Sequence, residues 1–335
     1  MKMLNLKDAI DLLADGEIVA IPTETVYGLA ADARCDMAVN KIFEAKKRPS
    51  DNPLIVHIGD VSQVDSLATD ISEKARLLMG HFWPGPLTLI LPCANVVSKL
   101  VTAGLNTIAL RIPKHKIALK LLSTSGIPLA APSANISGKP SPIRPEHVMH
   151  DMENRIAGII AGGVCEIGLE STVIDMTAPT PVILRPGSIT QEEIEAVIGP
   201  INIPDFVYEH PKSPGTKYTH YAPDAQLFIV KGSHKFFKSI ILENKKKGLR
   251  IGVLCHMSNH NFYRRANVSI GISNNGRKLY DTLRKFNRYE LDIILSEEFE
   301  DAVVMDRLMK ASNKRVLVES EIGDVFTFEN EIKID

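Results

Sequence analysis

Residues 18–29 read IVAIPTETVYGL, and they pass from an apolar run into a polar loop that contains a glycine. Ile18–Ile21 is short, apolar and closed by Pro22, which predicts a buried strand. Before it, Leu6–Ala14 has apolar side chains at helical spacing, and Gly16 ends that helix. A helix, a strand and a polar loop in this order are typical of an α/β sheet with polar residues at a strand end.

The same alternation continues toward residue 200. The predicted strands are 54–58, 87–91, 108–112, 173–176 and 182–185, and the predicted helices are 37–47, 72–79, 114–122 and 191–198. Residues 128–131 lead into a loop rich in serine, glycine and proline over 132–142. Several of these strands follow one another with little between them. The pattern therefore predicts an α/β fold whose twisted sheet is of mixed direction, not purely parallel.

The character of the sequence changes at about Asn202. Residues 204–225 are rich in proline and lack periodicity, and their tyrosines and histidines distinguish them from a Gly/Ser tether. We expect this segment to be a linker that acts as an active-site lid. Strands are predicted again at 227–230, 250–255, 267–272 and 291–296, with helices at 236–245, 278–288 and 303–311. The expected domains are a catalytic domain over 1–203 and a smaller, Rossmann-like, doubly wound α/β domain over 226–335.

The composition excludes several classes of protein. With 335 residues, of which 44% are hydrophobic and 24% charged, the chain has the profile of a globular protein of two domains. Its net charge of −1 carries no overall signature of nucleic-acid binding, and this total does not exclude local basic patches. The four cysteines are widely spaced, which argues against a disulfide framework and favours reduced thiols in the cytoplasm. No apolar run reaches about 18 residues and the start lacks a signal-peptide pattern, so we expect neither a membrane span nor export.

The first motif is Pro22–Leu29, which places hydroxyl groups beside the strand end. Such hydroxyls are well placed to meet a ligand. The alternative is a helix start, with a threonine as its cap and Glu24 in its first turn.

The second motif is KKRPSDNP over residues 46–53. The adjacent cations Lys46, Lys47 and Arg48 suit a triphosphate and a departing pyrophosphate, because lysine supplies a point charge and arginine a bidentate clamp. The alternative is a basic helix end, which the helix dipole favours.

The third motif is TIALRIP, in which Arg111 ends an apolar strand. A buried guanidinium must meet an anion. That anion is either an internal Asp or Glu or the carboxylate of a substrate.

The fourth and fifth motifs are PSANISGKPS over residues 132–141 and ESTVID with LRPG at 170–175 and 184–187. Closely spaced serines, an asparagine and a glycine offer donors to phosphate oxygens, as a phosphate-binding loop does. For the fourth motif an ordinary turn is the alternative, and the fifth places another hydroxyl pair and Arg185 beside predicted strands.

Each motif is weak alone, but their order resembles the Sua5/YrdC family. PTETVYGL, KKRPSDNPLIVH, FWPGPLTLIL, TIALRIP, PLAAPSANISGKPSP, ESTVID and LRPGSIT carry the resemblance up to about residue 200, and SPGTKYTHYAP resembles the Sua5 connector. The resemblance implies a nucleotidyltransferase that condenses L-threonine with bicarbonate or CO₂ and adenylates the carbamate with ATP. The product would serve the threonylcarbamoyl modification of an adenosine at position 37 of tRNA.

The resemblance also implies which residues form the site. The threonine pocket would use Thr25, His57, Arg111, Ala131 and Ser171. The ATP site would use Arg48, Asn52, Thr107, Ser133, Ser141, Arg185 and Tyr221. Lys47, Arg48, His57 and Arg111 would be the catalytic residues, and Mg²⁺ would enter with ATP, not in a protein cage.

No nucleophilic triad is expected, because the amine of threonine and then the carbamate are the nucleophiles. The protein has to position them and stabilise charge. His57 either contacts the substrate, takes part in proton transfer, or is a satisfied core histidine.

Two other functions compete with this one. An RNA-binding module of the same fold would bind in a salt-dependent way without turnover, and a carbamoyl-transfer enzyme would use carbamoyl phosphate instead of bicarbonate. Oligomeric state, threonine-versus-serine selectivity and the role of the C-terminal domain stay open, and so does contact with tRNA or the tRNA threonylcarbamoyltransferase.

Overall fold

The computed structural model describes residues 1–202, 220–322, 326 and 328. The chain divides into two compact units. Unit 1 is Met1–Ser137 with Ser141–Tyr218, and unit 2 is Gly138–Pro140 with Thr219–Asp335. The short segment Gly138–Pro140 belongs to unit 2 although it lies within the sequence of unit 1.

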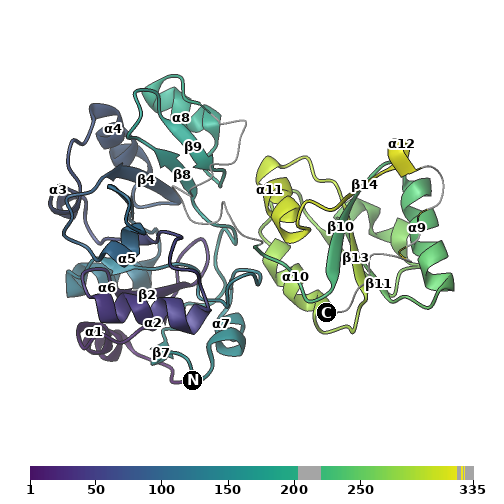
Figure 1. Ribbon diagram of the computed structural model, residues 1–335, viewed down its shortest axis with the longest axis horizontal. Helices are drawn as coiled ribbons and strands as arrows, with labels where there is room; N and C mark the ends of the chain where they lie inside the picture. The colour runs from purple at the N-terminus through teal and green to yellow at the C-terminus, as the bar shows by residue number, and fades with distance from the viewer. Residues whose placement is uncertain (203–219, 323–325, 327, 329–335) are drawn as a thin grey trace. The chain divides into compact units, whose positions relative to one another are not determined.

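Unit 1 contains a nine-stranded sheet in the order β7-β1-β2-β6-β3-β5-β4-β8-β9 (Figure 1). The strands are β1 (Val19–Ile21), β2 (Gly28–Asp32), β3 (Ile55–His57), β4 (Leu87–Pro92), β5 (Thr107–Arg111), β6 (Leu129–Ala130), β7 (Gly158–Ile159), β8 (Thr172–Asp175) and β9 (Val182–Arg185). β3 runs parallel to β5 and β4 parallel to β8, whereas β4 and β5 are antiparallel. The predicted mixed-direction sheet is confirmed.

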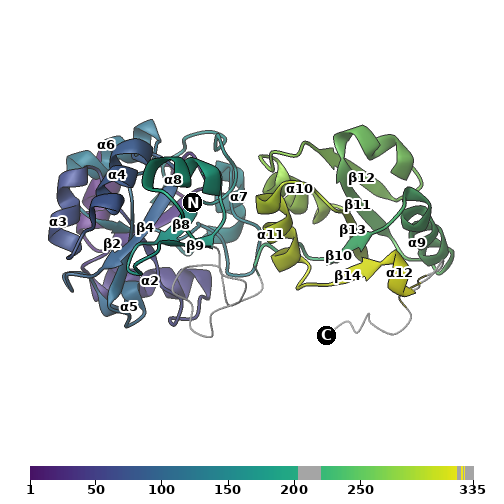
Figure 2. The same ribbon diagram turned by 90° about the horizontal axis from the view of Figure 1, so that it is seen from above.

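Helices lie on both faces of this sheet. They are α1 (Leu6–Ala14), α2 (Asp36–Lys46), α3 (Val64–Leu67), α4 (Glu73–Phe82), α5 (Lys99–Thr102), α6 (Lys116–Ser125), α7 (Pro145–Met152) and α8 (Gln191–Ile198), with a 3-10 turn η1 (Val61–Gln63). Figure 2 shows α4, α6 and α8 on one side of β2 and β4, and α2 and α5 on the other. Leu13 of α1 and Leu122 of α6 pack with Ile21 of β1 in one buried cluster.

Unit 2 contains a five-stranded, fully parallel sheet in the order β12-β11-β13-β10-β14. The strands are β10 (Gln226–Lys231), β11 (Ile251–His256), β12 (Val268–Ile272), β13 (Ile293–Glu297) and β14 (Val316–Val318). The helices are α9 (His234–Lys246), α10 (Leu279–Phe286), α11 (Ala302–Ala311) and α12 (Glu319–Ile322), with a 3-10 segment η2 (Met257–Tyr263). This is the doubly wound α/β arrangement expected for the second domain.

Most differences from the sequence-based elements concern short or atypical segments. β2 has the sequence GLAAD, which lacks β-branched and aromatic residues, and it forms because β1 and β6 pair with it on its two sides. No helix starts in the residues directly after Pro22. Residues 23–26 form a turn before β2, so the helix-start interpretation of the first motif is wrong. In the described part of the chain, none of the helices is both long enough and apolar enough to cross a membrane.

Candidate functional site

The turn between β1 and β2 is organised by the hydroxyl of Thr23. Its Oγ1 donates to the carbonyl of Val26 at 2.6 Å and accepts the backbone N–H groups of Thr25 and Val26, each at 3.2 Å. The two hydroxyls of Thr23 and Thr25 are 2.8 Å apart. This network fixes the Thr25 hydroxyl at the strand end, where the sequence places a ligand contact.

Arg111, at the carboxyl end of β5, is held by that same turn. Its Nη2 donates to Glu24 Oε1 at 2.6 Å and its Nη1 to Thr25 Oγ1 at 3.0 Å, while Nε donates to the carbonyl of Gly85 at 3.1 Å. The side chains of Arg111 and Glu24 are only 4% and 3% exposed. The anion that a buried Arg111 requires is therefore present inside the protein. Guanidinium N–H groups beyond these three remain for a ligand.

His57 ends β3, directly beside Arg111 in the parallel register. It is 3% exposed, and its Nδ1 has no hydrogen-bond partner among the described residues. Burial, and then the neighbouring Arg111 guanidinium, lower the pKa of His57 to about 3. The imidazole is thus neutral at neutral pH, and it suits a hydrogen-bonding role better than proton transfer.

Ser171 and Arg185 meet at the adjoining strands. Arg185 donates through Nη2 to Ser171 Oγ and through Nε to the carbonyl of Ser171, both at 3.0 Å. The Ser171 hydroxyl is also 2.7 Å from Thr88 Oγ1 of β4. Next to it, Ser141 Oγ donates to Glu170 Oε1 at 2.6 Å. The predicted residues Ser141, Ser171 and Arg185 are thus brought together.

The basic run after α2 does not form one cluster. Lys46 is 1% exposed, and its Nζ donates to the carbonyls of Ser133 at 2.5 Å and Asn135 at 2.7 Å. Burial, with a smaller effect of the Arg48 charge, lowers the pKa of Lys46 well below its usual value. Lys47 is exposed in a left-handed conformation at the helix end. Lys46 therefore anchors the Ser133 loop. Of the three cations, Lys47 is exposed and Arg48 is partly exposed.

Arg48 folds back over the turn that follows it. Its Nη2 lies 3.2 Å from the carbonyls of Asn52 and Pro53. Asn52 is 1% exposed, and its Oδ1 has no partner among the described residues. Thr107 begins β5 two residues before Ala109, which pairs with Ile55, so it lies alongside this turn. Arg48, Asn52 and Thr107 thus gather at the amino ends of β3 and β5.

Ala131 follows β6 and contacts the start of β3. Its N–H donates to the carbonyl of Ile55 at 2.9 Å, and the residue is 5% exposed. It packs directly against Gly28, where an added Cβ would lie 3.3 Å from the Ala131 Cβ. Ala131 is thus surrounded by close-packed backbone and methyl groups.

Tyr221 belongs to unit 2. It is 5% exposed, its ring centroid is 5.0 Å from that of Tyr280, and the Arg307 guanidinium lies 5.9 Å from its centre. The next residue, Ala222, donates its N–H to the carbonyl of Gly138 at 2.8 Å. A contact of Tyr221 with nucleotide and the lid role of 204–225 stay predictions, because most of that segment lies outside the described residues.

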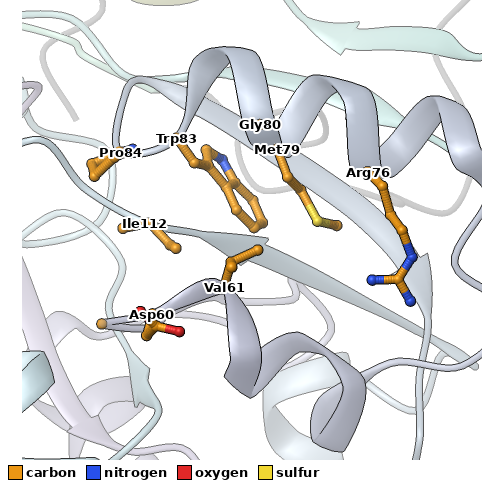
Figure 3. A pocket seen from close by; sticks show the side chains of 9 residues that line it. Asp60, Val61, Arg76, Met79, Gly80, Trp83, Pro84 and Ile112 are labelled. Atoms are coloured by element: carbon orange, nitrogen blue, oxygen red, sulfur yellow. The ribbon is translucent and has the colours of Figure 1, made fainter.

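A separate cavity of about 410 Å³ lies behind the strand ends of unit 1 (Figure 3). Figure 3 shows the side chains of Val61, Met79 and Trp83 pointing into it, with Asp60 and Arg76 at its margins. It contains none of the predicted site residues. Its apolar wall supports the β4 and β5 ends, and the Trp83 Nε1 donates to the carbonyl of Leu87 at 2.7 Å.

Three residues that contact the predicted site residues were not predicted from the sequence. Glu24 pairs with Arg111, Glu170 with Ser141 and Thr88 with Ser171. Both acids stand in the quoted motifs, and the need of a buried arginine for an anion was a usable signal for Glu24. Thr88 lies inside the apolar strand LTLILP, and its sequence offered no comparable signal.

Buried polar atoms without partners make the residues around Arg111 and Asn52 a candidate ligand site. Among the described residues they include Glu24 Oε2, Asn52 Oδ1 and His57 Nδ1. An unsatisfied buried polar atom costs about 1–3 kcal/mol unless something else satisfies it. No group of three or more His, Cys, Asp or Glu side chains suited to a metal occurs within 1–202, 220–322 or the two isolated described positions.

Family models match both halves of the chain. The model Sua5_yciO_yrdC, described as "Telomere recombination", matches residues 11–187, and the model for the threonylcarbamoyl-AMP synthase C-terminal domain, Sua5_C, matches residues 189–313.

Individual relatives match over nearly the full length. A threonylcarbamoyl-AMP synthase of Bacillus subtilis is 50% identical over 93% of this chain and 94% of its own, and one of Pyrococcus abyssi is 45% identical over 93% and 95%. A crystal structure of P. abyssi Sua5 complexed with L-threonine superposes with a TM-score of 0.88 at 45% identity, covering 93% of this chain and 95% of that one.

Proposed function

Because the chain belongs to the Sua5/YciO/YrdC family and carries the Sua5 C-terminal domain, we propose that it is an L-threonylcarbamoyladenylate synthase. It condenses L-threonine, bicarbonate or CO₂ and ATP to threonylcarbamoyl-AMP and releases pyrophosphate. The product supplies the threonylcarbamoyl group for adenosine 37 of tRNA.

The observation that carries the proposal is the set of unsatisfied, buried polar atoms around Arg111, in a chain 45% identical to a Sua5 that was crystallised with L-threonine. L-Threonine offers a carboxylate, an amine and a hydroxyl. The free guanidinium N–H groups of Arg111 suit the carboxylate. Glu24 Oε2 and His57 Nδ1 suit the amine and hydroxyl hydrogens. We assign Thr25, His57, Arg111, Ala131 and Ser171 to this pocket.

The chemistry then needs positioning more than acid–base groups. The threonine amine attacks the carbon of CO₂ and loses a proton, or attacks bicarbonate with release of water, and either route gives the carbamate. A carbamate oxygen then attacks the α-phosphorus of ATP as pyrophosphate leaves. We assign Arg48, Asn52, Thr107, Ser133, Ser141 and Arg185 to ATP, with exposed Lys47 beside the departing phosphates. Their donors would stabilise the charge that develops on the phosphoryl oxygens.

Mg²⁺ would enter with the nucleotide. The described residues offer hydroxyls, amides and cations to the phosphates, not a carboxylate cage, which fits a metal carried by the phosphates of ATP. When bound, it would neutralise phosphate charge. The four free cysteines fit the reducing cytoplasm, where we place the enzyme.

Pyrophosphate release tests the proposal. We expect release from ATP only when L-threonine and bicarbonate are both present. Carbamoyl phosphate in place of bicarbonate should give none. Turnover without threonine, or with carbamoyl phosphate as the carbon source, would place the chain in another reaction class.

A further inference from the structure

Unit 2 has a pocket of its own, between α9 and the η2 segment. Its volume is about 420 Å³. It is lined by Lys238, Ile241, Leu242, Asn261, Phe262, Tyr263, Arg264 and Arg265. Apart from Asn261, the lining consists of aliphatic, aromatic and cationic side chains, and it contains no acid.

The three cations of this pocket are not neutralised. Lys238, Arg264 and Arg265 are all exposed, and none has an acidic partner in the part of the chain that the structure describes. Arg264 donates only to the amide oxygen of Asn261, at 2.7 Å from Nη2. The acid of α9, Glu243, is already paired with Lys246 at 2.6 Å. The pocket therefore has a positive potential that suits an anion.

An exposed aromatic ring stands among these charges. Phe262 is 46% exposed, and His234 stacks on it with ring centroids 4.6 Å apart at an interplanar angle of 22°. Lys238 Nζ lies 5.2 Å from the centre of the Phe262 ring. Behind it, the Tyr263 hydroxyl is fixed by Glu297 at 2.6 Å and by His234 Nδ1 at 2.8 Å. The Phe262 ring is thus backed by His234, which itself contacts the fixed Tyr263 hydroxyl, and it stays partly exposed.

The positive surface extends beyond the pocket along α9. Lys235 and Lys245 are exposed, and Lys245 Nζ donates to the carbonyl of Arg265 at 2.7 Å, which joins the helix end to the pocket rim. A mononucleotide would use only the pocket. A surface that combines a row of cations with an exposed ring fits a longer strand, with phosphates on the cations and a base on the ring.

We propose that the α9–η2 surface of unit 2 binds a single-stranded segment of RNA, with phosphates at Lys238, Arg264 and Arg265 and a base stacked near Phe262. The choice of RNA over DNA rests on the proposed function, whose product is consumed on tRNA. The net charge of the whole chain, −1, conceals this local patch. The surface is built entirely from residues of unit 2.

Fluorescence anisotropy of the full chain with a labelled single-stranded RNA of about 12 nucleotides tests the proposal, since such sites span roughly 4–16 nucleotides. The variant Lys238→Ala/Arg264→Ala/Arg265→Ala should bind at least about tenfold more weakly. Its slope of log affinity against log salt should fall by about two, at about 0.7 per lost phosphate contact. Phe262→Ala should weaken binding about tenfold with the salt slope unchanged, because it removes stacking and no charge.

The matched control is Lys231→Ala/Arg250→Ala, whose cations are already paired with Glu298 and Glu290, and it should bind like the unchanged protein. Pyrophosphate release should be unchanged in all variants, so failure of the catalytic proposal is seen separately. Equal RNA affinity in the triple variant and the unchanged protein would overturn the proposal. So would tighter binding of DNA of the same sequence, or loss of affinity in the control variant equal to that in the triple variant.

Discussion

The buried pair of Glu24 and Arg111 is the interaction on which the proposed threonine pocket most depends. Arg111→Ala removes three hydrogen bonds and leaves a carboxylate that is 3% exposed without its cation. Breaking a buried pair from one side costs about 3–5 kcal/mol, because the remaining charge stays desolvated. Glu24→Gln should cost a similar amount. A domain that is stable by about 5–15 kcal/mol survives either change.

The double variant Glu24→Gln/Arg111→Met removes both charges at once. Its loss should fall short of the sum of Glu24→Gln and Arg111→Met measured singly by about 2 kcal/mol or more, since no unpaired charge remains. Arg111→Lys keeps the charge but loses the planar fork, so it should fold well and still bind threonine poorly.

Trp83 makes the measurement specific. It is the one tryptophan of the chain and it lies in unit 1, so its fluorescence during urea unfolding reports that unit alone. Isothermal titration with L-threonine gives the second readout. Additive single-variant losses would refute the coupled buried pair. Unchanged threonine affinity in Arg111→Lys and Arg111→Ala would refute the assignment of Arg111 to the substrate.

The other predictions concern charge and packing. Because the pKa of His57 is lowered to about 3, the unfolded state takes up a proton below about pH 6.5 and the folded state does not, so stability falls as the pH drops. At pH 5 this amounts to about 2 kcal/mol, and His57→Gln should flatten the urea–pH curve by that amount; parallel curves would contradict it. Lys47→Ala and Arg48→Ala should raise the KM for ATP about tenfold or more and leave threonine binding nearly unchanged, which calorimetry with each substrate checks. Lys46→Met should lower the unfolding free energy by about 2–4 kcal/mol, because two buried carbonyls lose their donor; an unchanged urea midpoint would exclude this anchor. Tyr221→Ala should reduce ATP turnover more than Tyr221→Phe, which keeps the stacked ring, and equal kinetics of the two would remove Tyr221 from the nucleotide assignment.

The local pattern of apolar and polar residues was sufficient to predict elements such as β1 and α1, whose own composition favours the structure that they form. The apolar run before Pro22 and the helical spacing of Leu6–Ala14 formed β1 and α1 at nearly the expected bounds. β2 was not predictable in this way, because the composition of GLAAD favours no strand. Only pairing with β1, which directly precedes it, and with β6, which lies far along the chain, makes it one. The mixed direction of the sheet followed from the close spacing of strands, but their order in the sheet depends on these long-range pairings.

In the candidate site too, the sequence predicts which chemical groups need a partner, but the fold decides which residue becomes that partner. A strand that ends in Arg111 predicts a buried cation that needs an anion, and this holds. The identity of that anion depends on the turn at Thr23, which places Glu24 Oε1 at 2.6 Å from Arg111 Nη2. The neutral state of His57 likewise follows first from its burial and then from its place beside Arg111 in the sheet register, and the linear sequence contains neither.

The run Lys46, Lys47 and Arg48 shows why adjacent charges in sequence need not act together. Lys46 is the last residue of α2, whereas Lys47 and Arg48 follow it, so helix geometry places only the first of the three side chains. Lys46 falls on the buried face and anchors the carbonyls of Ser133 and Asn135, whereas Lys47 ends the helix in an exposed, left-handed conformation. The proposed phosphate-binding role therefore rests on Lys47 and Arg48. Lys46 acts on the same chemistry indirectly, by fixing the loop whose donors are assigned to ATP.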